Sequence, residues 1–197
     1  ENTVVIFTSD NGGVSSGDAY ATSCLPLRGG KGRQWEGGIK QPYYIKVPGL
    51  TQAKSTSAIP VTGTDFYPTM LELAGLPAMP EQHIDGLSLV PLFKGNKIAE
   101  RALFWHYPHY GNQGGAPHGA IRDGDWKFIE WFEDGAVELY NIPQDISEKT
   151  NLAAQHPDKV AALRAKLIAW RTEVGAVMPT PNPNYDPNAK PEPAAAR

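Results

Sequence analysis

Residues 120–141 form the stretch AIRDGDWKFIEWFEDGAVELYN, in which short apolar runs are separated by two turns that each contain an Asp-Gly pair. Asp-Gly pairs favour tight hairpin turns, and the runs between them are rich in the β-branched and aromatic residues that favour strands. The preceding run at 102–105 (ALFW) has the same character. These patterns predict an antiparallel meander over residues 102–141.

A helix is predicted directly after the meander. Pro157 suits a first helical turn, and Gly175 suits a helix end. Between them apolar residues recur at steps of three and four, namely Val160, Leu163, Leu167, Trp170 and Val174. This spacing gives one apolar stripe, which we expect to pack on the meander. Residues 179–197 contain six prolines and predict an extended tail.

The first part of the chain has the patterns of an α/β domain. Residues 4–7 (VVIF) predict a buried parallel strand that ends in a glycine-containing loop. Because a parallel strand needs neighbours, we expect further chain to precede this strand. A second strand is predicted within 42–49, and a helix is predicted that Thr64 or Asp65 caps and Gly75 ends.

The composition excludes several classes of protein. The chain has 197 residues, 20% of them charged, and a net charge of -3, so no basic surface for nucleic acid is expected. Its single cysteine excludes an internal disulfide and any zinc site made of several thiolates. No run approaches the ~20 apolar residues that a membrane-spanning helix needs. We therefore expect neither nucleic acid nor a membrane as a partner.

Three side chains in glycine-containing segments have chemistry typical of binding sites. Asp10 and Asn11 lie side by side and offer the carboxylate and amide oxygens that Ca²⁺ or Mg²⁺ prefers, although Asp-Asn-Gly-Gly is also an ordinary turn sequence. Lys31 lies in the loop RGGKG (28–32), where a glycine backbone lets an ammonium approach an oxyanion closely. The alternative for Lys31 is a solvated loop lysine.

A polar and aromatic cluster occupies residues 105–118. It contains His106 and His109 among tyrosines and amides, and sugars favour such surfaces. The alternative is a loop whose rings pack under the meander.

Several motifs together resemble the second half of the type I sulfatase family. They are SDNGG at 9–13, PLRGGKG at 26–32, WEGGI at 35–39, TDFYPTMLELAG at 64–75, DGLSLVPL at 85–92 and ELYN at 138–141. The resemblance covers roughly residues 3–175 and implies an α/β fold. Residues 1–101 would be the C-terminal part of an alkaline-phosphatase-like sandwich, residues 102–178 a small antiparallel β-sheet subdomain with one packed helix, and residues 179–197 a Pro-rich tail.

The resemblance also implies a function, the hydrolysis of sulfate esters on a sulfated carbohydrate or an aryl sulfate. Asp10 and Asn11 match the pair that holds calcium in the family, and Lys31 matches the lysine that contacts the sulfate ester. The small subdomain borders the substrate pocket in this family, so we expect His106 and His109 to bind the substrate. The formylglycine nucleophile and the remaining calcium ligands are expected in an N-terminal part of the same enzyme. This chain alone would then be inactive, and the family implies a periplasmic or secreted enzyme.

Cys24 opens the segment CLPLR (24–28), which fits the C-x-P-x-R pattern of a formylglycine precursor. In the family that cysteine lies upstream of the acid–amide pair and begins a helix. Cys24 instead lies 14 residues after Asp10 and precedes a glycine-rich stretch that does not favour a helix. We therefore predict that Cys24 is not modified. The chain also departs from many relatives at 40–42, where it has Lys-Gln-Pro in place of Arg-Val-Pro, so substrate contacts are not transferred to that position.

Two other functions are compatible with the sequence. A related phosphodiesterase or phosphonate hydrolase would share the fold, but it would use an unmodified Thr or Ser as its nucleophile. A non-catalytic glycan-binding module would use the meander and the cluster at 105–118. Metal-dependent turnover by the intact protein would exclude the binding module.

Overall fold

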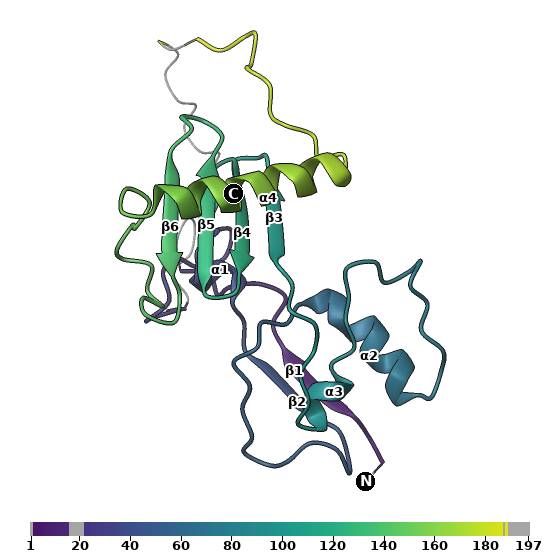
Figure 1. Ribbon diagram of the computed structural model, residues 1–197. Coiled ribbons are helices and arrows are strands. Elements are labelled where there is room, and N and C mark those ends of the chain that lie inside the picture. Colours follow the sequence, from purple (N-terminus) through teal and green to yellow (C-terminus); the bar gives the residue numbers. More distant parts are fainter. Residues whose placement is uncertain (1, 16–21, 187, 189–197) are drawn as a thin grey trace, which may run out of the picture.

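The computed structural model describes residues 2–15, 22–186 and 188. Its elements in chain order are β1 (Val5–Thr8), α1 (Glu36–Ile39), β2 (Tyr43–Lys46), the 3-10 helix η1 (Gly63–Asp65), α2 (Phe66–Leu73), α3 (Val90–Phe93), β3 (Leu103–Tyr107), β4 (His118–Asp123), β5 (Trp126–Trp131), β6 (Val137–Asn141) and α4 (Pro157–Glu173). β1 and β2 form a two-stranded sheet at one end of the molecule, beside α2 and α3 (Figure 1). β3 to β6 form a four-stranded sheet at the other end, with α4 lying across it.

The predicted meander is confirmed. The strand order of the larger sheet is β3-β4-β5-β6, and each neighbouring pair is antiparallel. The two Asp-Gly turns place Gly124 at φ 57° and Gly135 at φ 72°, a region that favours glycine. β3 extends to Tyr107, so only residues 108–117 of the predicted polar cluster form a loop.

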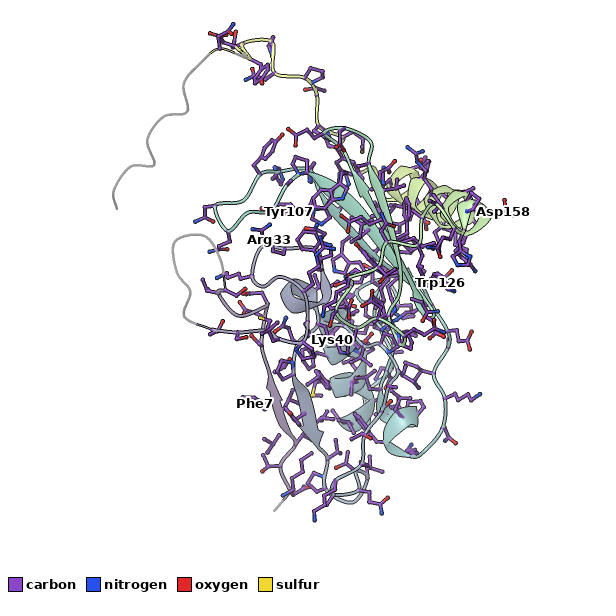
Figure 2. All side chains as sticks on the ribbon, turned by 90° about the vertical axis from the view of Figure 1, so that its left-hand side faces the viewer. Phe7, Arg33, Lys40, Tyr107, Trp126 and Asp158 are labelled. Carbon is purple, nitrogen blue, oxygen red and sulfur yellow. The ribbon has the colours of Figure 1, made fainter. Side chains whose placement is uncertain are left out.

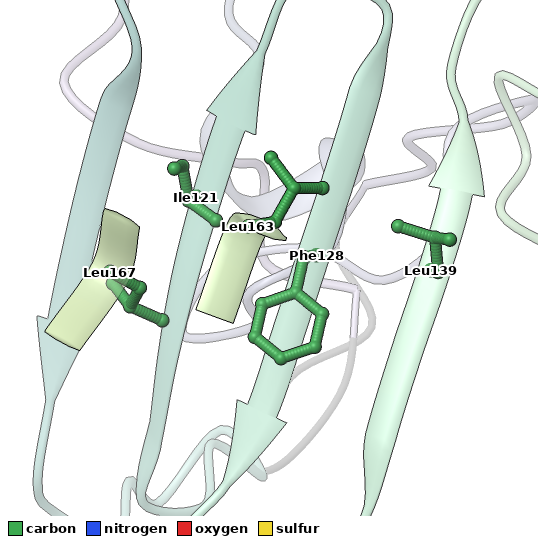
Figure 3. Close-up of a cluster of buried hydrophobic side chains, with 5 residues drawn as sticks. All are labelled: Ile121, Phe128, Leu139, Leu163 and Leu167. Carbon is green, nitrogen blue, oxygen red and sulfur yellow. The ribbon is translucent and has the colours of Figure 1, made fainter. Parts of the chain in front are cut away.

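The predicted helix is also confirmed, and it covers one face of the sheet. Its Leu163 and Leu167 pack in one buried cluster with Ile121, Phe128 and Leu139 of the sheet (Figure 3). Val160 and Trp170 pack against this cluster, and the Trp170 ring stacks on Phe104 with centroids 4.9 Å apart. Val174 is the exception in the predicted stripe. It is 53% exposed because the helix ends at Glu173 and Val174 lies at its C-cap.

The opposite face of the sheet is covered as well. Ala120, Ile129 and Tyr140 of this face are buried together with Ile142. Trp35, which directly precedes α1, packs against them, and so do Trp105 and Trp131 of the sheet. The segment around α1 therefore lies against the face that points away from α4.

The first strand differs from its prediction. β1 pairs antiparallel with β2, in a register that places Phe7 opposite Tyr44, and Val5 and Phe7 are 52% and 67% exposed. The reason is that β1 has one strand neighbour among the described residues and no layer packed over these two side chains. The predicted buried parallel strand is therefore not formed by the described part of the chain.

The 3-10 helix η1, which leads directly into α2, begins with a capping box formed by Thr62 and Asp65. The Thr62 N–H donates to Asp65 Oδ2 at 2.8 Å, and the same carboxylate forms an ion pair with Arg101. Of the two predicted caps, Thr64 and Asp65, the structure has Asp65 at the N-cap of α2. Gly75, at φ 69°, follows the end of α2 as expected.

Two further findings concern membrane-spanning helices and the C-terminal tail. None of the helices in the described ranges combines the length and the apolar character needed to cross a bilayer. In the predicted tail, residues 179–186 and 188 contain neither helix nor strand, and the rest of the tail lies outside the described residues.

Candidate functional site

Three segments that the sequence separates come together at one place, and we call them the glycine cluster: residues 10–13, 28–32 and 35–38. The Gly12 N–H donates to the Gly38 carbonyl at 3.0 Å, and the Lys31 N–H donates to the Gly13 carbonyl at 2.9 Å. The Gly37 N–H donates to the Arg28 carbonyl at 2.8 Å. These backbone bonds fix the loop of Asp10 and Asn11 relative to the loop of Lys31.

The glycines of this cluster are required by close backbone contacts. A Cβ atom built at Gly12 would lie 2.2 Å from the Gly37 carbonyl oxygen. A Cβ at Gly37 would lie 2.5 Å from the Arg28 carbonyl oxygen, and one at Gly38 would lie 1.9 Å from the Arg33 carbonyl oxygen. Larger residues at these positions would force the backbones apart, so the glycine pattern is explained by packing as well as by turns.

The predicted ligands belong to this cluster. Asp10 is exposed, and Asn11 and Lys31 are half-buried. Within the ranges that the structure describes, neither the Asp10 carboxylate nor the Lys31 ammonium takes part in an ion pair. A half-buried ammonium held on a fixed backbone without a counter-ion is suited to bind an anion.

Asp10 and Asn11 fit part of a calcium site. Their oxygens are of the hard type that calcium prefers, but calcium takes about 6–8 ligands. The described residues contain no group of three or more His, Cys, Asp or Glu side chains that could hold a metal ion. The two residues therefore suit a metal only if other ligands complete the site.

Trp35 is fastened to the sheet by Glu138 of β6. The Trp35 Nε1–H donates to Glu138 Oε2 at 2.9 Å, and the Trp131 Nε1–H donates to Oε1 at 3.1 Å. The Tyr140 hydroxyl also donates to Oε2, at 2.6 Å. Burial, followed by the hydrogen bond to Glu138, raises the pKa of Tyr140, so the phenol stays protonated and keeps this bond at neutral pH. One carboxylate thus holds the residue that leads into α1.

Glu36, the next residue, is held by buried charges. Lys127 Nζ lies 3.1 Å from Glu36 Oε1 and 2.8 Å from Glu148 Oε1. The Glu36 N–H donates to Glu148 Oε2 at 2.6 Å. Glu36 is 4% exposed, and Lys127 and Glu148 are fully buried. Sequence reasoning missed this group because its members are far apart in the chain. One signal was present in β5, where strand alternation places Lys127 on the same face as the apolar residues Ile129 and Trp131 and so indicates a buried lysine.

The arginine of the C-x-P-x-R pattern has a structural role. Arg28 Nη1 donates to the Tyr140 hydroxyl at 2.9 Å and to the Glu148 carbonyl at 3.0 Å, and its guanidinium lies 3.7 Å from the centroid of the Trp35 ring. Residues 22–35 contain turns and bends but no helix, which confirms that no helix follows Cys24 directly. Cys24 and Arg28 both line an open cleft of about 670 Å³.

The loop 108–117 lies against the glycine cluster. Arg33 Nε donates to the Gln113 carbonyl at 3.0 Å, and a Cβ atom at Gly115 would lie 2.4 Å from the Gly32 carbonyl oxygen. Figure 2 shows Arg33 and Tyr107 on the side of the sheet away from α4, whose Asp158 lies on the other side. The loop and the Lys31 segment therefore border the same region.

The two predicted substrate-binding histidines lie in different surroundings. His109 is exposed in the loop 108–117, and its ring lies 5.5 Å from that of Tyr107. His106 Nε2 instead lies 2.9 Å from the Val177 carbonyl oxygen, and its ring lies 5.5 Å from that of Phe132. His109 thus belongs to the loop that contacts the Lys31 segment through Gln113 and Gly115, whereas the contacts of His106 are with Phe132 and Val177.

His118 is the third histidine of the polar and aromatic cluster at 105–118, and it is buried at the start of β4. Burial lowers the pKa of His118, so the ring is neutral at pH 7, and its Nδ1–H donates to the Ala116 carbonyl at 2.8 Å. Its ring lies 5.7 Å from that of Tyr107 and 5.9 Å from that of Trp131. His118 therefore matches the alternative given for the cluster at 105–118, a ring that packs under the meander.

Comparisons with known proteins give a consistent result. Residues 31–173 match the family model described as "N-sulphoglucosamine sulphohydrolase, C-terminal". A protein named sulfatase from Formosa agariphila is 37% identical over 86% of this chain and 33% of its own length. Human arylsulfatase A is 34% identical over 83% of this chain and 37% of its own length. The chain thus spans about a third of the length of these relatives.

Solved structures agree with the sequence matches. The crystal structure of Ps i-CgsB in complex with k-i-k-neocarrahexaose is similar with a TM-score of 0.70 and 31% identity, over 86% of this chain and 36% of that chain. A protein solved in complex with its substrate D-glucosamine-2-N,6-O-disulfate has a TM-score of 0.67 over 87% of this chain and 34% of that chain. At 24% identity, the second likeness concerns the fold alone.

Proposed function

Because this chain belongs to the sulfatase family, we propose that it supplies the sulfate-binding side of an enzyme that hydrolyses sulfate esters of carbohydrates. The resemblance inferred from the sequence is confirmed, and so is the fold class, the C-terminal part of an alkaline-phosphatase-like α/β sandwich with a small antiparallel subdomain. The observation that carries the proposal is the Lys31 ammonium. It has no ion pair within the described ranges, and its backbone is bonded to the loop of Asp10 and Asn11.

Lys31 is proposed to bind the sulfate ester and to stabilise charge on its oxygens. As the S–O bond breaks, negative charge grows on the leaving oxygen, and a fixed ammonium lowers the energy of that state more than mobile water does. The backbone bond from Lys31 to Gly13 holds the lysine loop in place before the substrate arrives. A preorganised group of this kind needs no reorganisation during the reaction.

Asp10 and Asn11 are proposed to hold a calcium ion together with ligands from another part of the enzyme. A bound calcium ion supplies positive charge that polarises the sulfate group. The charged Asp10 would contribute more to the affinity than the neutral Asn11, because an ionised carboxylate attracts a divalent cation more strongly than an amide oxygen does.

The nucleophile is proposed to come from the part of the enzyme outside these 197 residues. Cys24 lies in a turn and its Sγ lies 3.8 Å from the Gly13 carbonyl oxygen, a placement that supports our prediction that it is not the modified residue. A formylglycine hydrate in the remaining part would attack sulfur, and the alcohol would leave.

The substrate is proposed to be a sulfated carbohydrate that contacts the loop 108–117. Support comes from a similar solved protein, 31% identical to this chain, whose ligand is a neocarrahexaose. Tyr107 lies beside Gly115, which contacts Gly32, and the His109 ring lies 5.5 Å from that of Tyr107, so we expect both rings to contact the sugar. His106 remains a weaker candidate, because its contacts are with Phe132 and Val177.

The experiment that tests this function measures sulfate release by the full-length enzyme, with a sulfated glucosamine, a small aryl sulfate and an aryl phosphodiester as substrates. Asp10→Ala is expected to abolish sulfate release at low calcium and Asn11→Ala to reduce it less, while the control Asp158→Ala, at an exposed carboxylate of α4, keeps wild-type rates. Wild-type activity of Asp10→Ala in chelator would overturn the metal assignment. Turnover of the phosphodiester alone would point to the phosphodiesterase alternative.

The contribution of the loop 108–117 is tested by comparing the two sulfate esters. His109→Ala is expected to raise KM for the sulfated sugar and to leave the aryl sulfate nearly unaffected, because the aryl ester makes no sugar contacts. His106→Ala is expected to give a smaller change. Equal losses on both esters would place a histidine at the sulfate itself, and unchanged kinetics on both would remove the loop from the substrate site.

A further inference from the structure

Four buried or half-buried charges lie between the sheet and the segment that carries Lys31. We call them the charge junction: Lys127, Glu36, Glu148 and Arg122. We propose that Lys127 is a positioning residue for the sulfate-binding segment 28–38, an inference that rests on the proposed function.

The junction is balanced in charge and largely buried. Lys127 Nζ contacts Glu36 Oε1 at 3.1 Å and Glu148 Oε1 at 2.8 Å, and Arg122 Nη1 lies 3.8 Å from Glu36 Oε2. The side chains of Lys127 and Glu148 are fully buried. Two positive and two negative charges therefore face each other where water does not compensate for a missing partner.

The junction is linked to Lys31 by a short backbone path. Glu36 is held from both ends, by Lys127 at its carboxylate and by Glu148 at its N–H. The next two residues bond the rest of the cluster, since the Gly37 N–H donates to the Arg28 carbonyl and the Gly38 carbonyl accepts from Gly12. A shift of Glu36 is therefore passed directly to both loops of the glycine cluster.

The distribution of partners predicts what happens when Lys127 is removed. Glu36 keeps Arg122 as a partner, and its carboxylate stays compensated. Glu148 has Lys127 as its cationic partner within the described ranges, so its carboxylate is left buried and uncompensated. An uncompensated buried charge is strongly unfavourable, and the structure relieves it by moving the two carboxylates apart or by admitting water.

The first test uses the full-length enzyme with Lys127→Met and the control Lys159→Met, at an exposed lysine of α4. We expect Lys127→Met to lower kcat/KM per folded molecule on the order of 10- to 100-fold, because small misplacements of a binding group are costly. Amide exchange in peptides covering 28–38 is expected to become on the order of 10-fold faster. Lys159→Met is expected to change neither quantity. Unchanged kcat/KM and unchanged exchange in Lys127→Met would overturn the inference.

A second test separates charge from packing. Lys127→Met combined with Glu148→Gln leaves only Glu36 and Arg122, which are balanced, and the glutamine can still accept the Glu36 N–H. We expect the double variant to regain most of the kcat/KM lost in Lys127→Met, a non-additive result that a purely packing role does not produce. A double variant that is no more active than Lys127→Met would overturn the inference.

The exchange measurement also keeps the two proposals apart. If the wild-type enzyme released no sulfate from any ester, the proposed function would fail. Faster exchange at 28–38 in Lys127→Met, reversed in the double variant, would still establish the positioning role. Slow exchange in all variants of an active sulfatase would instead overturn the positioning role alone.

Discussion

Both faces of the four-stranded sheet bury apolar side chains, but among the described residues the fully buried ion pair, Lys127–Glu148, lies on the face toward the glycine cluster. The face toward α4 packs Ile121, Phe128 and Leu139 against two leucines of the helix. The face toward the glycine cluster presents Lys127 and Glu138, which bind the α1 segment through ion pairs and hydrogen bonds. Both faces belong to the same strands, because neighbouring residues of a strand point to opposite sides.

The difference shows a division of labour within one small subdomain. Apolar packing is non-directional, so it stabilises the fold but tolerates small movements. Ion pairs and hydrogen bonds depend on distance and angle, so they fix the orientation of a segment more sharply. The α4 face is therefore expected to govern stability, and the other face is expected to govern the placement of Lys31.

The largest expected effect on stability comes from the α4 face. Phe128→Ala should lower the free energy of unfolding by about 3–5 kcal/mol, because it leaves a cavity in the buried cluster. Activity per folded molecule should stay near the wild-type value. Denaturant unfolding and kinetic assays of the folded fraction check the two parts, with Val174→Ala at the exposed C-cap as the control. A large loss of activity per folded molecule would contradict the division between the faces.

A smaller effect on stability is expected on the opposite face. Glu138→Gln should cost about 1–3 kcal/mol, because the amide group of glutamine would face a donor from Trp35, Trp131 or Tyr140. It should also lower kcat/KM, since Trp35 leads into α1. Parallel unfolding and kinetic measurements on Glu173→Gln, at the exposed end of α4, provide the comparison. Glu138→Gln with reduced stability and unchanged kcat/KM would mean that Trp35 is only a packing residue.

The smallest effect is a dependence on pH in Lys127→Met. Burial raises the pKa of the Glu148 carboxyl, and the Lys127 ammonium counteracts this, so the variant should have a still higher pKa there. Between the pKa of the carboxyl in the unfolded state and its higher pKa in the folded state, the folded protein binds a proton that the unfolded protein has lost. Stability therefore falls as pH rises through this range. The Tm difference between wild type and Lys127→Met should therefore be smaller at pH 5 than at pH 8. Equal differences at the two pH values would argue that Glu148 does not titrate in this range.

The contrast between the faces also explains what could be predicted from the sequence. The α4 face follows from local patterns, the steps of three and four around Leu163 and Leu167 and the Asp-Gly turns of the meander. The motifs SDNGG and PLRGGKG indicated Asp10, Asn11 and Lys31 as candidates through a family resemblance. Their approach in space depends on backbone bonds such as Lys31 to Gly13, which no local pattern indicates.

The opposite face could not be predicted in the same way. The partners Glu36 and Lys127 are 91 residues apart, and Glu36 and Glu148 are 112 residues apart, so no periodicity connects them. His106 shows a second limit. Its position three residues before His109 in the sequence suggested a shared site. Strand alternation in β3 instead turns His106 toward Phe132 and Val177.

The most direct test of the central claim is the kinetic effect of Lys31→Ala in the full-length enzyme on a sulfate ester. We expect kcat/KM to fall on the order of 100-fold or more, with unchanged unfolding, because one preorganised charge-stabilising group is lost. The control Lys97→Ala, at an exposed loop lysine, should keep the wild-type value. A Lys31→Ala enzyme with near-wild-type kcat/KM would show that Lys31 is a solvated loop residue and would contradict the proposed sulfate site.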